Sequence, residues 1–128
     1  MNLKKLMFLA AMTAKPQEEN LLDYSDLVNK NYGGSANAYN VRTEGVINVK
    51  PGASMVLTGL QVDQLNVRFY DKDGNYNNQS VVKYNIETPV VEFTVPDDCY
   101  SLRPKWYRVE TELPVSEVVA SNPVIKYI

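Results

Sequence analysis

The chain of 128 residues contains no histidine and one cysteine, Cys99. Without histidine it lacks the commonest general base, the usual activator of a serine or cysteine nucleophile, and the commonest ligand for transition metals. A single cysteine excludes an intrachain disulfide and a thiolate metal cluster, so we expect Cys99 to be a small buried apolar residue. Paired carboxylates could still act as in glycosidases, but no motif marks such a pair. The sequence therefore predicts a protein that is not an enzyme and that needs no metal or cofactor.

The chain also lacks a strong charge of one sign and a long apolar run. Lysine and arginine number 13 against 15 aspartate and glutamate, a net charge of -2, so we expect no nucleic-acid partner. No stretch approaches the roughly 20 apolar residues that a membrane-spanning helix needs. The remaining composition, 45% hydrophobic and 22% charged, is that of a folded protein, and the length suits one domain.

The first fourteen residues, MNLKKLMFLAAMTA, combine two lysines with a short apolar run. This is the outline of a signal peptide, although the apolar run is short and Met12 fits a cleavage site poorly. The alternative is a retained anchor that buries its apolar side chains in a symmetric oligomer or in a socket of a larger assembly. Three copies around an axis would bury these side chains together, although the sequence fixes no copy number. The anchor residues are Leu3, Leu6, Met7, Phe8 and Leu9.

A polar stretch separates this segment from the rest of the chain. Residues 15–20 contain Pro16 and a Gln-Glu-Glu run, which is typical of a linker, so we place the domain at residues 21–128. Its first part, up to residue 39, is rich in Asn, Gly and Ser and predicts a long loop or a short helical turn.

The rest of the domain shows short segments rich in Val, Ile, Thr and aromatic residues, at the spacing of an all-β sandwich. Leu65, Val67 and Phe69 alternate with polar or aromatic residues, the clearest strand pattern in the chain. A hairpin turn follows at residues 71–75, and Pro104 predicts an edge position or a bulge for its strand. We expect no helix of ordinary length after residue 14. The predicted strands are 41–49, 54–60, 65–70, 81–86, 90–95, 102–107 and 124–128.

The hairpin turn carries part of a calcium-loop pattern. Asp71, Asp73 and Asn75 occupy the first, third and fifth positions, but the sixth is not glycine and the twelfth, Val82, is not glutamate. A tight turn with Gly74 at positive φ explains the same residues. No metal site is predicted.

Aromatic residues beside arginine or asparagine suit a sugar site, because a ring covers the apolar face of a pyranose while polar groups bind its hydroxyls. The alternative is that the tryptophan belongs to the core and the tyrosines pack at strand edges. The candidate glycan-binding residues are Arg68, Tyr70, Arg103, Trp106 and Tyr107.

Several short segments follow one another in an order that carries a family resemblance. They are Asn-Leu-Leu-Asp at 20–23, GVINVKPG at 45–52, VRFYDKDG at 67–74, FTVPDD at 93–98 and YSLR at 100–103. Together they resemble the accessory β-domains of bacteriophage fibres and baseplates, including carbohydrate-binding-like jelly rolls. The tail after residue 107 has no counterpart in that pattern.

This resemblance implies a jelly-roll-like antiparallel β-sandwich in a phage virion structural protein, a head-fibre, tail-fibre or capsid decoration subunit. The N-terminal anchor would hold it in the virion with the binding domain outward. The expected partners are other virion proteins, further copies of the chain and a cell-surface glycan. The second hypothesis is a secreted or cell-surface carbohydrate-binding module whose first fourteen residues are a signal peptide. An enzyme acting on oligosaccharides is a third hypothesis, which the absence of histidine disfavours.

Overall fold

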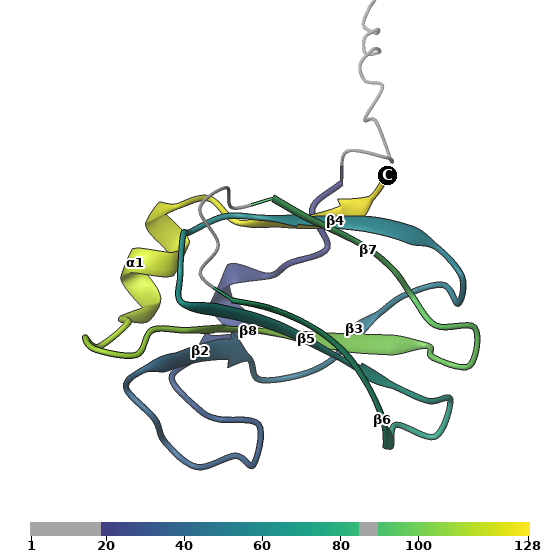
Figure 1. Cartoon of the computed structure of the whole chain (residues 1–128), viewed down its shortest axis with the longest axis horizontal. Helices are drawn as coiled ribbons and strands as arrows, with labels where there is room; N and C mark the ends of the chain where they lie inside the picture. Colours follow the sequence, from purple (N-terminus) through teal and green to yellow (C-terminus); the bar gives the residue numbers. More distant parts are fainter. Residues whose placement is uncertain (1–18, 85–89) are drawn as a thin grey trace, which may run out of the picture.

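The computed structural model describes residues 19–84 and 90–128. The predicted anchor residues and residues 15–18 of the predicted linker lie outside the described residues. Within the described part, two antiparallel sheets pack face to face, one above the other in Figure 1. The predicted all-β antiparallel sandwich is confirmed, and its finer assignment to a jelly roll stays a prediction.

In the described residues the larger sheet has six strands and the smaller sheet has three. The order of the larger sheet is β1-β2-β8-β5-β6, with β3 also paired to β8, and the order of the smaller sheet is β7-β4-β9. The strands are β1 (Leu27–Val28), β2 (Asn40–Thr43), β3 (Ile47–Asn48), β4 (Ser54–Thr58), β5 (Gln64–Tyr70), β6 (Tyr76–Tyr84), β7 (Val90–Thr94), β8 (Ser101–Tyr107) and β9 (Val124–Tyr127).

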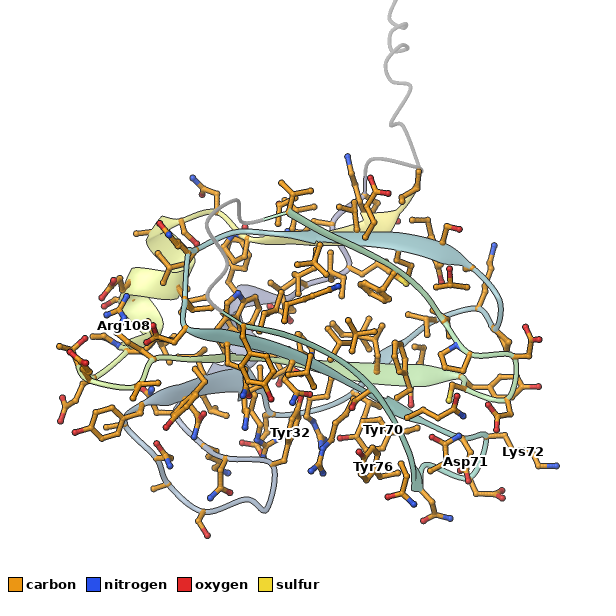
Figure 2. All side chains as sticks on the ribbon, in the orientation of Figure 1. Tyr32, Tyr70, Asp71, Lys72, Tyr76 and Arg108 are labelled. Carbon is orange, nitrogen blue, oxygen red and sulfur yellow. The ribbon has the colours of Figure 1, made fainter. Side chains whose placement is uncertain are left out.

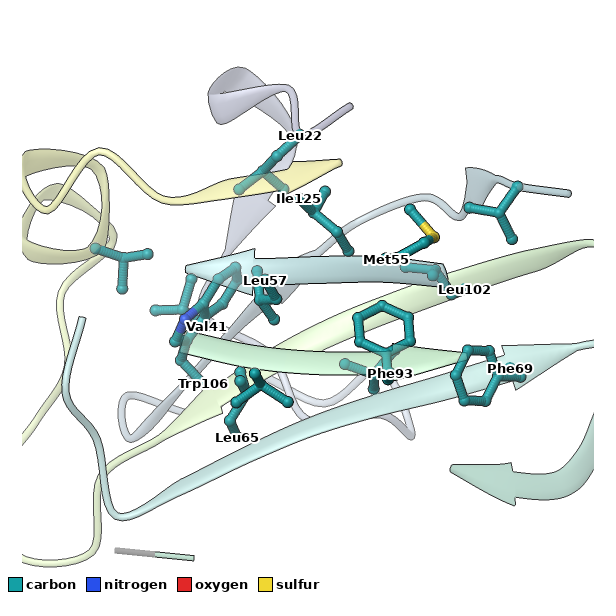
Figure 3. Packing of buried hydrophobic residues seen from close by; sticks show 14 of the residues in the cluster. Leu22, Val41, Met55, Leu57, Leu65, Phe69, Phe93, Leu102, Trp106 and Ile125 are labelled. Atoms are coloured by element: carbon teal, nitrogen blue, oxygen red, sulfur yellow. The ribbon is translucent and has the colours of Figure 1, made fainter. Parts of the chain in front are cut away.

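The core lies between the sheets because the strands alternate in what they bury. In β5, Leu65, Val67 and Phe69 are buried, as their period-two spacing predicts. From the opposite sheet, Phe93 of β7 packs its ring against that of Phe69, with 5.8 Å between the ring centroids (Figure 3). Each large side chain buried in this way contributes roughly 1.5 to 3 kcal/mol to stability.

Of the two positions predicted for Pro104, an edge strand or a bulge, the structure excludes the first and shows a bulge beside it. Its strand, β8, is not an edge strand, because β5 pairs with one side of it and β2 and β3 with the other. Arg42 of β2 opposes Lys105, and Ile47 of β3 opposes Leu102, so the intervening residues 43–46 bulge beside Pro104. A residue without a backbone N–H is tolerated there because no strand residue opposes it on that side. The same bulge divides the predicted strand 41–49 into two.

The hairpin turn after β5 has the predicted form. Gly74 has φ of +83°, and the Asp71 carboxylate accepts hydrogen bonds from the backbone N–H groups of Asp73 and Asn75, both at 2.9 Å. The strand after the turn begins earlier than predicted, at Tyr76, because Tyr76 pairs directly with Tyr70 across the hairpin.

Short helical elements lie at both ends of the domain. A single 3-10 turn, Tyr24–Asp26, precedes β1, in agreement with the predicted helical turn. Near the C-terminus the structure adds α1 (Val115–Ala120), a helix of six residues that the sequence analysis did not predict. Val118 of this helix and Leu113 before it are fully buried, so the tail belongs to the core. No helix in residues 19–84 and 90–128 has the length and apolar character needed to cross a membrane.

Candidate functional site

Polar and aromatic side chains gather on the outer face of the larger sheet, the face turned away from the smaller sheet. On this face the register of β5 and β8 pairs Gln64 with Tyr107, Arg68 with Arg103, and Asn66 with Lys105. Tyr70 follows on the same face at the last position of β5, but it is buried, at 7% exposed. Four of the five predicted glycan-binding residues, Arg68, Tyr70, Arg103 and Tyr107, therefore come together.

The structure places Trp106, the fifth predicted residue, elsewhere. Its side chain is 1% exposed and belongs to the hydrophobic core, because β8 turns alternate residues toward the smaller sheet. A buried ring offers no face to a sugar, so Trp106 is not part of this site.

Tyr32, which the sequence analysis did not single out, completes the face. It comes from the segment between β1 and β2, and its single hydroxyl proton is shared between the backbone oxygens of Arg103 at 2.7 Å and Asn66 at 3.1 Å. Burial raises the pKa of the Tyr32 hydroxyl, which keeps this donor protonated. Figure 2 shows Tyr32 beneath the larger sheet, near Tyr70 and Tyr76.

Contacts between cations and rings link five side chains, which we name the tyrosine–cation row: Tyr107, Lys105, Tyr32, Arg68 and Tyr76. The Arg68 guanidinium carbon lies 4.3 Å from the ring centroid of Tyr32 and 4.2 Å from that of Tyr76. The Lys105 ammonium lies 4.7 Å from the centroid of Tyr32 and 6.0 Å from that of Tyr107. Cation–π attraction of this kind stabilises a charge without neutralising it.

The two cations of the row have no anionic partner among the described residues. The two ion pairs found there are Lys30 with Glu44 and Arg108 with Glu117, and neither Arg68 nor Lys105 makes a side-chain hydrogen bond within residues 19–84 and 90–128. Burial lowers the pKa of Lys105, and the neighbouring charges of Arg68 and Arg42 lower it further. The row therefore carries two positive charges that no acidic side chain of residues 19–84 and 90–128 neutralises.

Two other arginines on the face serve the fold instead. Arg103 donates to the backbone oxygen of Glu44 at 3.0 Å and to the hydroxyl of Tyr70 at 3.2 Å. Arg42 donates to the backbone oxygens of Asn31 and Thr43, both at 2.9 Å. The bonds of Arg103 stabilise the bulge after β2, and those of Arg42 stabilise the segment that carries Tyr32. Arg103 is therefore a structural residue in this site.

An open hollow of about 930 Å³ adjoins the row where β5 begins and β8 ends. Gln64 has Tyr107 opposite it on one side and Tyr84 on the other, and the Tyr84 side chain is strongly exposed, at 67%. The backbone N–H of Val109 donates to the Asp63 carboxylate at 2.7 Å, which connects the segments before β5 and after β8 that line the hollow. The lining residues are Gln61, Val62, Asp63, Gln64, Tyr84, Tyr107, Arg108, Val109, Glu110 and Thr111.

The chemistry of the described residues gives no further support to catalysis or metal binding. Over residues 19–84 and 90–128, no group of three or more His, Cys, Asp or Glu side chains is placed to hold a metal ion. Cys99 is fully buried, as predicted, and burial raises the pKa of its thiol, which disfavours the nucleophilic thiolate. That the chain is not an enzyme stays a prediction.

Comparisons with known proteins do not assign the chain to a family. No protein-family profile matches the chain, and no curated protein matches it. Among solved structures, the chain is similar to the enzymatically active domain of tailspike protein 4 of bacteriophage CBA120, with 19% identity and a TM-score of 0.48. The match covers 70% of this chain and 14% of that one, so the chain spans about a seventh of its length. A likeness at this level carries no conclusion about function.

Proposed function

We propose that this chain is a structural subunit of a bacteriophage particle, in a head fibre, a tail fibre or a decoration protein. Its β-sandwich binds a cell-surface carbohydrate through the outer face of the larger sheet. The tyrosine–cation row carries the binding part of this proposal, since it joins three tyrosine rings and two cations on one face. The resemblance of residues 20–103 to phage fibre domains supports the virion part.

The face suits sugars because it offers both of the contacts that carbohydrate recognition uses. Tyr84 and Tyr107 offer aromatic surface beside the hollow, and Gln64 between them offers an amide donor and acceptor. Rings of this kind cover the C–H face of a pyranose, while amide groups bind its hydroxyls. No step of this function requires a reaction, so the role is recognition and assembly.

The virion part is tested by mass spectrometry of purified particles and of the culture medium from the same source. The intact chain, with peptides from residues 1–14, should be found in the particles. If the chain is instead found in the medium and begins near Lys15, the virion proposal is wrong. The alternative, a secreted carbohydrate-binding module, would then hold.

The binding part is tested separately with the purified chain on an array of bacterial surface glycans. We expect retention of a subset of glycans, and we expect replacement of Tyr84 and Tyr107 by alanine to reduce it. Each lost aromatic contact should weaken binding several-fold. Equal binding by this double variant would show that the face is not the site.

A further inference from the structure

We propose that Arg68 and Lys105, which both lie against the ring of Tyr32, bind the negatively charged group of an acidic carbohydrate. This inference rests on the proposed carbohydrate-binding function and names the class of sugar. It is carried by the arrangement of the two cations, for which residues 19–84 and 90–128 supply no anionic partner.

The first step of the argument is the state of Arg68. A guanidinium that lies over aromatic rings directs its N–H donors sideways, in its own plane. The rings of Tyr32 and Tyr76 lie 4.3 and 4.2 Å from the guanidinium carbon, while no described residue accepts a hydrogen bond from its nitrogens. The N–H donors of Arg68 are thus available to a ligand, and an arginine with free donors can bind a carboxylate or sulfate with two hydrogen bonds.

The second step is the proximity of Lys105. Its ammonium lies 4.7 Å from the centroid of the Tyr32 ring, which Arg68 also contacts, so the two cations flank one ring. Burial lowers the pKa of Lys105, and the charge of Arg68 lowers it further. Like charges held together without a counter-ion cost stability. An acidic ligand at this ring would reduce the repulsion between the two charges, which favours its binding.

The contrast with the other arginines of the face supports a ligand role. Arg42 and Arg103 donate hydrogen bonds to backbone oxygens and to the hydroxyl of Tyr70, as is typical of an arginine that stabilises the fold. Arg68 and Lys105 have no such use within residues 19–84 and 90–128. The guanidinium of Arg68 and the ammonium of Lys105 therefore bind no other polar group in that part of the chain.

The third step is the continuity of the site with the hollow. Gln64, at the hollow, and Arg68 lie on the same face of β5, four residues apart, which is about 13 Å along a strand. A sugar chain lying along β5 would place one ring against Tyr84 or Tyr107 and an acidic group of a neighbouring sugar at Lys105 and Arg68. A single-stranded nucleic acid also stacks on tyrosines beside cations, but it uses a positively charged groove that follows its backbone, and the row supplies two cations.

The experiment measures binding of the full chain to four polymers by calorimetry. Polygalacturonate carries carboxylates and dextran sulfate carries sulfates, while carboxyl-reduced polygalacturonate and dextran are uncharged controls. We expect at least one charged polymer to bind about tenfold or more tightly than its uncharged counterpart, and to weaken as salt is raised. Whichever charged polymer binds identifies the oxyanion.

Three variants locate the site. Arg68→Gln and Lys105→Gln should each weaken binding of the charged polymer about tenfold. Lys50→Gln is the matched control, since Lys50 also lies over a tyrosine, Tyr127 at 5.6 Å, but away from the row. It removes the same charge and should leave binding unchanged. Arg68→Lys keeps the charge and the ring contact but loses the planar fork, so it should also bind less tightly with an unchanged melting temperature.

The outcomes separate this inference from the function on which it rests. If the uncharged polymers bind as well as the charged ones, or if Arg68→Gln binds as well as the wild type, the acidic-ligand inference is wrong and carbohydrate binding stands. Failure to bind these polymers and every glycan on the array would overturn both. Tight binding of oligo(dT) that competes with the charged polymer would replace the carbohydrate by a nucleic acid.

Discussion

Single residues fix the turn between β5 and β6, and Gly74 is the clearest of them. Its φ of +83° lies in the left-handed region, where a side chain branched at Cβ is strongly disfavoured. Nothing lies within 4 Å of an added Cβ, so a substitution there tests backbone strain and not crowding.

We therefore expect Gly74→Val to lower the free energy of unfolding by on the order of 1 to 3 kcal/mol, measured by urea denaturation. Gly74→Asn is the control, because asparagine tolerates the same backbone conformation, and it should cost clearly less. An unchanged midpoint for the valine variant would contradict the turn.

The position of the Tyr32 side chain could not be predicted from the sequence. It lies in a run of Asn, Gly and Ser that has no periodicity, so nothing local places its ring on the sheet. Its position depends on hydrogen bonds to backbone oxygens of residues 34 and 71 positions away. By contrast, the alternation in β5 alone placed Arg68 and Tyr70 on one face.

Among the elements, α1 buries Val118 in the core and also makes an ion pair with the segment that follows β8. Arg108, which follows β8, donates two hydrogen bonds to the carboxylate of Glu117 in α1. These bonds lower the pKa of Glu117. Because the folded pKa lies below the unfolded value, the stabilisation is fully present above the unfolded pKa of about 4.3. It is lost as the pH falls through the folded pKa.

Glu117→Gln should accordingly lower the free energy of unfolding at pH 7 by less than about 1 kcal/mol, since the Glu117 side chain is 42% exposed and solvent screens the pair. The difference from the wild type should shrink as the pH falls below about 4. Urea denaturation at pH 7 and pH 3 measures this. Glu92→Gln, on an exposed position of β7, is the control. A difference that stays constant with pH would show that the ion pair does not stabilise the helix.

The elements also show why some predictions were right and others were wrong. Strands with a clear period of two, such as β5 and β7, were predicted correctly because one face of each is buried. For Pro104 the sequence left an edge position and a bulge open, because the residues that decide between them, 43–46, lie more than 50 residues earlier in the chain. The helix α1 was missed because it has six residues and no polar N-cap bond, since Pro114 occupies the cap position.

For the whole molecule, the central prediction concerns residues 1–14. Leaving Leu3, Leu6, Met7, Phe8 and Leu9 in water would forgo roughly 1.5 to 3 kcal/mol for each large side chain that a partner could bury. Deletion of residues 1–14 should leave a soluble β domain with an unchanged circular dichroism spectrum that no longer oligomerises or joins its particle. Light scattering of the full and shortened chains measures this. If the shortened chain assembles equally well, an export signal becomes the better explanation of the segment.

The two ends of the described domain lie together, on the side of the smaller sheet. The backbone N–H of Leu21 donates to the oxygen of Ile125 in β9 at 2.8 Å, and that of Ile128 donates to the oxygen of Ser54 in β4 at 3.0 Å. Figure 1 shows the start of the described chain near the C-terminus, with the larger sheet in the opposite layer. A particle that holds several copies of the chain through these two ends would leave the tyrosine–cation row of each copy accessible. Millimolar affinity at each row would then add up to firm attachment, because each bound copy raises the effective concentration of the others at the same surface.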